Sequence, residues 1–214
     1  FNSKIPTLDE KFGTQNGVMP NEELIPEEAF EYEVGGRIVI HKTYLEAVYF
    51  SKEITNWIVP KYSLGIKKFV NEKKVITNGI EIIASADVFN CLKNRSNLTL
   101  QGSENLTNSS AHSGKLLPYI PFVTVHNHIE YYTTTWSLYY DVSYISRMYR
   151  DLSNDWESTP QFTHDLFGTY HIGSKWKIVV GVEDILSDNI ADESVYDSYP
   201  SPGRRFSIHI SINQ

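Results

Sequence analysis

Residues 203–214 read GRRFSIHISINQ, and the alternation in this stretch decides the fold. Its central side chains switch between apolar and polar at every step: Phe206, Ser207, Ile208, His209, Ile210, Ser211 and Ile212. Successive side chains of a β-strand point to opposite faces, so this pattern predicts a strand with one apolar face and one polar face.

The same alternation recurs in two earlier stretches. Their apolar positions are Trp136, Leu138, Tyr140, Val142 and Tyr144 in the first, and Trp176, Ile178, Val180 and Val182 in the second. Long amphipathic strands with Tyr and Trp near their ends are typical of a β-barrel in a membrane, where the aromatic rings lie at the lipid–water interfaces. We therefore predict an all-β, antiparallel transmembrane β-barrel fold.

Composition narrows the possible classes of protein further. The 214 residues are 41% hydrophobic and 21% charged, as expected for a folded protein. The net charge of -7 argues against nucleic acid as a partner, because phosphate binding depends on Lys and Arg. No apolar run approaches the roughly 20 residues of a membrane helix, so a membrane location would require strands. The single cysteine, Cys91, excludes an intrachain disulfide.

Turn residues divide the chain into about nine segments with strand character. The predicted strands are 28–40, 43–55, 73–88, 95–107, 121–132, 134–149, 160–172, 175–186 and 203–213. Most have ten residues or more, whereas strands of soluble proteins usually have about 5 or 6 and tilted membrane strands need about 9 to 11. This length favours the membrane interpretation.

The predicted connections alternate between short and long. Short joints lie near 41–43, 133–135 and 173–174, and long connections at 56–72, 108–120, 150–159 and 187–202. Outer-membrane barrels have short periplasmic turns and long extracellular loops, so we expect the first long strand to run inward. Pro6, Pro20 and Pro26 cannot donate to a ladder and predict an external loop before that strand. Bacterial single-chain barrels have an even number of strands, so nine strands suit a portion of a larger barrel.

Seven stretches in order carry a resemblance to a known family. They are PTLDEKFG (6–13), LIPEEAFEYEVGGRI (24–38), LEAVYFSKEITNWI (45–58), NGIEIIAS (78–85), LPYIPF (117–122), VEDILSD (182–188) and PSPGRRFSIHISI (200–212). With this order and spacing, the chain resembles the C-terminal part of TonB-dependent outer-membrane receptors. Two local differences are Asp184, where many members have the Asn of an Asn-Leu-Phe step, and a C-terminus of Asn213 and Gln214 instead of an aromatic residue.

The resemblance implies a function and a set of partners. Such receptors are barrels of about 22 strands in the bacterial outer membrane, contacting its lipid and enclosing an N-terminal plug. They import scarce nutrients such as ferric siderophores, cobalamin or glycans with energy delivered by the TonB complex. Residues 1–214 would supply roughly the last nine strands, that is, barrel wall and extracellular loops, with a ferric siderophore or similar iron complex as the expected ligand. The plug, the earlier strands and the TonB contact would belong to an N-terminal part outside this sequence.

Residues with the chemistry of a catalytic or metal site are few. His126, His128 and Glu130 lie two residues apart, so they share one face of a strand. The barrel interpretation turns Val125, Ile129 and Tyr131 toward lipid and places all three as polar residues facing the lumen. A polar lumen accounts for them without a metal. No nucleophile motif such as GxSxG is present. We therefore expect neither catalysis nor a cofactor.

Aromatic residues of the long connections are the candidates for ligand contact. They are Trp57, Tyr62, Trp156 and Tyr199. Such rings stack on siderophores, corrins or sugars, although interfacial Trp and Tyr of a membrane girdle show the same pattern.

A second class of fold and function stays open from the sequence: a secreted β-sandwich that acts as a carbohydrate-binding module. The apolar strand faces discriminate between the two. A sandwich must bury Trp136, Tyr140, Trp176 and Ile208 against a second sheet, whereas a barrel exposes them.

Overall fold

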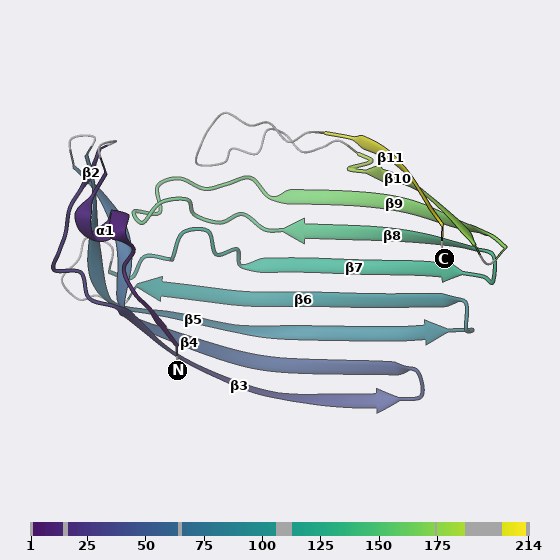
Figure 1. Cartoon of the computed structure of the whole chain (residues 1–214). Helices are drawn as coiled ribbons and strands as arrows, with labels where there is room; N and C mark the ends of the chain where they lie inside the picture. Colours follow the sequence, from purple (N-terminus) through teal and green to yellow (C-terminus); the bar gives the residue numbers. More distant parts are fainter. Residues whose placement is uncertain are drawn as a thin grey trace.

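The computed structural model describes residues 2–14, 17–63, 66–105, 113–173, 175–186 and 203–212. Within these ranges, nine long strands follow one another: β3 (Glu27–Ile40), β4 (Thr43–Ser63), β5 (Ile66–Val88), β6 (Leu92–Asn105), β7 (Val123–Tyr132), β8 (Trp136–Ile145), β9 (Gln161–Ile172), β10 (Trp176–Glu183) and β11 (Arg205–Ile212). Each pairs antiparallel with the next, so the order in the sheet follows the order in the chain (Figure 1). The nine strands predicted from the sequence are confirmed. In the described residues β3 and β11 do not pair, so the sheet is open.

The prediction of a long loop over 56–72 is wrong. β4 and β5 continue through this range and remain paired, with Trp57 opposite Glu72 and Val59 opposite Val70. Asn56 interrupts β4 locally with a φ of 55°. The hairpin therefore extends well beyond the neighbouring strands on the side of the long connections, which we call the long-loop end.

The segment before β3 is folded as well, where the sequence predicted only a loop. It contains β1 (Asn2–Lys4), which pairs with the start of β3, α1 (Leu8–Phe12), and β2 (Val18–Met19), which runs parallel to β5. The Asn71 side chain accepts from Ile25 N–H at 3.1 Å and donates to Ile25 C=O at 3.0 Å, which ties the segment to the hairpin. We call residues 2–14, 17–26, 57–63 and 66–72 the hairpin module. In the described residues, no helix has the length and apolarity needed to cross a membrane.

Tight turns connect the strands at the opposite end, the short-turn end. In the turn between β5 and β6, Phe89 and Asn90 have φ values of 56° and 55°. Two consecutive positive φ values define a type I′ turn, whose twist matches that of an antiparallel hairpin. Gly173, in the turn after β9, has a φ of 59°, which glycine adopts without steric cost.

The two faces of the sheet differ in polarity. Trp136, Trp176 and Ile208 are 42%, 45% and 74% exposed, and all three lie on the same apolar face. The described residues form one sheet, and nothing in it covers these side chains. The β-sandwich alternative is therefore wrong, because a sandwich buries this face.

The buried apolar side chains lie away from most of the sheet. In the described residues they are Leu24, Ile58, Val59, Val75 and Leu117. The first three belong to the hairpin module, Val75 lies just beneath it on β5, and Leu117 lies in the connection before β7. The core is thus confined to the long-loop end.

Candidate functional site: the polar face of the sheet

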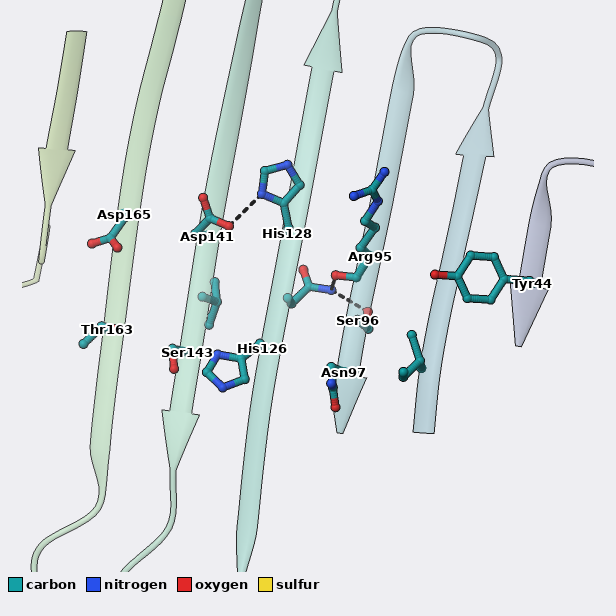
Figure 2. A pocket seen from close by; sticks show the side chains of 13 residues that line it. Tyr44, Arg95, Ser96, Asn97, His126, His128, Asp141, Ser143, Thr163 and Asp165 are labelled. Atoms are coloured by element: carbon teal, nitrogen blue, oxygen red, sulfur yellow. Dashed lines mark hydrogen bonds and ion pairs between the residues drawn. The ribbon is translucent and has the colours of Figure 1, made fainter. Parts of the chain in front are cut away.

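A hollow of about 460 Å³ lies on the face opposite the exposed tryptophans. Two rows of polar side chains from β6 to β9 line it: Arg95, His128, Asp141 and Asp165 in one row, and Asn97, His126, Ser143 and Thr163 in the other. Figure 2 shows the two rows side by side across the strands. They form because cross-strand partners share a face and the register aligns four polar positions twice. Ser96, Asn127 and Val142 border the same hollow, but strand alternation points their side chains to the apolar face.

Hydrogen bonds fix several of these groups. His128 Nδ1 lies 2.7 Å from Asp141 Oδ1, and both side chains are more than a third exposed. Asn97 Nδ2 donates to Glu81 Oε1 at 2.7 Å. Asp165 Oδ1 accepts from the Asp184 N–H at 2.8 Å. The hollow therefore offers carboxylates, imidazoles and one guanidinium, a set that can bind polar groups of either charge.

An aromatic row borders the hollow on the side of the short-turn end. The rings of His128 and Tyr139 are 5.6 Å apart, and Tyr139 stacks on Phe167 at 4.9 Å. Phe167 lies over Gly181, where a Cβ would collide with the ring. A glycine on the neighbouring strand thus makes room for an aromatic ring to lie flat on the wall.

The sequence predicted only some of the polar side chains that line the hollow. His126, His128 and Glu130 share the polar face of β7 as expected, and Glu130 lies opposite Lys93 and Tyr139. Within the described residues, no three His, Cys, Asp or Glu side chains come together as metal ligands. Arg95, Asp141 and Asp165 were missed, although their polar positions in alternating strands were the available signal.

The predicted ligand-contact aromatics lie in different places. Trp57 is in the extended part of β4 and Tyr62 near its tip, so neither lies in a loop. Trp156 is in the connection after β8, where its ring lies 5.1 Å from the Arg150 guanidinium carbon. Tyr199 lies outside the described residues. Trp57 and Trp156 therefore lie on separate elements, β4 and the connection after β8.

The connection around Trp156 is held by its own polar contacts. Asp151 accepts from Ser153, Asp155 and Trp156 N–H groups at 3.0, 3.1 and 2.9 Å. Nearby, the hydrogen bond to Glu157 is the main cause that raises the pKa of Tyr149 above its ordinary value. This connection presents Trp156, which is 41% exposed, at the long-loop end.

An open antiparallel sheet with one apolar exposed face, one hollowed polar face, tight turns at one end and long connections at the other defines a segment of a transmembrane β-barrel. A comparison of the sequence with known protein families identifies the family. Residues 3–185 match the family described as "TonB dependent receptor-like, beta-barrel". The chain belongs to this family of bacterial outer-membrane proteins.

Solved structures share the fold at low sequence identity. The copper transporter OprC superposes with a TM-score of 0.79 at 17% identity, covering 98% of this chain and 35% of its own. The ferric enterobactin receptor PfeA of Pseudomonas aeruginosa superposes with a TM-score of 0.75 at 19% identity, covering 91% of this chain and 32% of its own. The siderophore receptor PirA of Acinetobacter baumannii superposes with a TM-score of 0.72 at 15% identity, covering 91% of this chain and 33% of its own. The chain thus spans about a third of the length of these receptors. No curated protein matches the chain in sequence.

Proposed function

We propose that residues 1–214 form the C-terminal barrel wall of an outer-membrane receptor that imports a scarce nutrient, with a ferric siderophore or a similar iron complex as ligand. The chain supplies wall and extracellular loops. The plug, the earlier strands and the TonB contact belong to the N-terminal part of the receptor. Outer-membrane lipid covers the apolar face, and catalysis has no part in this function.

The observation that carries the proposal is the family match over a sheet with two unlike faces. An apolar outer face suits hydrocarbon, and a polar hollowed face suits a water-filled or plugged lumen. The printed names of PfeA and PirA, a ferric enterobactin receptor and a siderophore receptor, support an iron complex as the ligand class. In this arrangement His126, His128 and Glu130 face the lumen. Trp57, Tyr62, Trp156 and Tyr199 are candidates for contact with the arriving ligand.

Uptake by the full-length receptor tests the function. The receptor would be expressed in a host that lacks its own siderophore receptors, and uptake of radioactive iron would be measured with catecholate, hydroxamate and phenolate siderophores. We expect uptake of one class, abolished by a protonophore because import is energised. If none of the iron complexes enters, while copper, cobalamin or a glycan does, the iron proposal is overturned.

A labelling experiment tests the direction of the polar face. In a Cys91→Ser background, Ser143→Cys and its neighbour Val142→Cys would be exposed in native outer membranes to a charged, membrane-impermeant thiol reagent. We expect rapid labelling at Ser143→Cys and slow labelling at Val142→Cys, because lipid excludes the reagent. Equal labelling at the two positions would contradict a lumen-facing polar row.

A further inference from the structure

Three polar side chains interrupt the apolar face of β6 and β7. Asn94 and Ser96 occupy outward positions of β6, and Asn127 lies opposite Ser96 on β7. Their row neighbours on the same face are Ile129, opposite Asn94, and Val142, opposite Asn127. The three form a polar patch within the surface that otherwise meets lipid.

The patch lies at the depth of the hydrocarbon. Asn127 is the middle of five outward positions on β7, with Val123 and Val125 toward the long-loop end and Ile129 and Tyr131 toward the short-turn end. The ring centroids of Tyr131 and Trp136 are 5.3 Å apart, as expected for an aromatic girdle at the lipid–water interface. A strand of ten residues just spans the bilayer core, so its central position lies near the midplane.

Hydrogen bonds inside the patch satisfy it only in part. Asn127 Nδ2 donates to Ser96 Oγ at 2.6 Å, and Ser96 Oγ donates to Asn94 Oδ1 at 3.1 Å. The contact between Asn94 Nδ2 and Asn127 Oδ1 is 3.4 Å, longer than a normal N–H···O bond. Each amide has two donor hydrogens and an acceptor with two lone pairs. A donor of Asn94 and the acceptor of Asn127 are therefore left with weak partners.

Hydrocarbon offers no partner for these groups, and unsatisfied polar groups in lipid are costly. We infer that the patch of Asn94, Ser96 and Asn127 is a contact site for a second copy of the receptor within the membrane. The amide donors and acceptors are complementary to themselves, so two copies related by a two-fold axis can bond reciprocally. On β5, Ala84 lies opposite Ser96 and Ala86 opposite Asn94, and these small side chains beside the patch let two walls approach closely.

Cysteine cross-linking of the full-length receptor in native outer membranes tests this contact. In a Cys91→Ser background, Asn94→Cys, Ser96→Cys and Asn127→Cys would be oxidised and analysed on non-reducing gels. The control is Val180→Cys, which is outward, 49% exposed and three strands away on β10. We expect a covalent homodimer from at least one patch position and none from the control. Monomer at all three positions, or a cross-link to another protein, would overturn the inference.

A second measurement separates dimerisation from import. In Asn127→Leu the polar group is absent, and the dimer dissociation constant in lipid nanodiscs should rise roughly 3- to 30-fold, the loss expected for a hydrogen bond across a membrane interface. An unchanged dissociation constant would contradict the inference. Nutrient uptake by this variant reports on the proposed function alone, because the substitution lies on the face away from the hollow.

Discussion

The hairpin module differs from the rest of the sheet in how its apolar side chains are covered. We call that rest, the parts of β3 to β11 outside the module, the wall. In the hairpin module, Leu24, Ile58 and Val59 are at most 6% exposed, and Lys61 pairs at 2.9 Å with Glu72, whose side chain is 3% exposed. On the wall, by contrast, large apolar side chains such as Ile208 and Val180 are 74% and 49% exposed. The module has a small core of its own, whereas the apolar face of the wall is covered by lipid in the proposed function.

The comparison explains where the hydrophobic effect acts. In water, removing apolar area from solvent is worth roughly 25 cal/mol per Å². The hairpin module obtains this gain by packing the N-terminal segment on β4 and β5. In the proposed function the wall would obtain this gain by transfer into the membrane, so its strands would need no second layer and could remain one sheet thick.

The largest expected effect breaks the core of the module. Leu24→Ala removes a side chain that is 3% exposed and leaves a cavity, at a cost of about 2–5 kcal/mol. Because this core is local, the loss should detach the N-terminal segment while the wall stays folded. Hydrogen exchange of the full-length receptor should show faster exchange in residues 17–26 and unchanged exchange in β8 and β9. Ile25→Ala, at a position 49% exposed, is the matched control; equal exchange in the two variants would contradict the local core.

A charge on the outer face should be nearly as damaging, but to the wall. Leu98→Arg places a guanidinium among Ile82 and Val125 on the apolar face, at a cost of about 2–4 kcal/mol near the bilayer midplane. Asn97→Arg is the control, since Asn97 lies on the opposite face and already contacts Glu81. Urea unfolding in lipid vesicles should show a large loss of stability for the first variant and little for the second. Similar losses for both would mean that the two faces meet the same solvent.

Alternation sufficed to predict the wall but not the hairpin module. In β8, β10 and β11 one face has an apolar residue at every second position, so strands and faces could be derived from local sequence. The module depends on contacts between distant residues, such as Asn71 with Ile25 and Asn21 with Phe69. The prolines of the N-terminal segment predicted a loop, and 56–72 was predicted as a long connection. Long-range packing overrode both predictions.

In the candidate site, too, strand alternation predicted the face of a residue but not its partner on the next strand. The shared face of His126 and His128 follows from their spacing on one strand. The partnership of His128 with Asp141 depends on the register between β7 and β8, which is set by the turn at 133–135 and by pairing along both strands. The order of residues within each row was therefore beyond strand alternation alone.

The smallest expected effect is a pH dependence of stability that comes from the Glu10 carboxylate in the hairpin module. Burial acts to raise the pKa of Glu10, but the Thr7 N–H at 2.7 Å and the Lys4 ammonium at 3.3 Å outweigh it and hold the pKa below its ordinary value of 4.5. A lowered pKa stabilises the folded state above pH 4.5, and this contribution is lost as the pH falls through the folded pKa. It should be under about 1 kcal/mol, because the Lys4 side chain is half exposed and water screens its charge. Protection of residues 2–12 against hydrogen exchange, corrected for the intrinsic pH dependence, should therefore fall below pH 4.5. Glu10→Gln keeps an oxygen that can accept from Thr7 but carries no charge, so its protection should not change over this range. The same pH dependence in both proteins would assign the effect to another group.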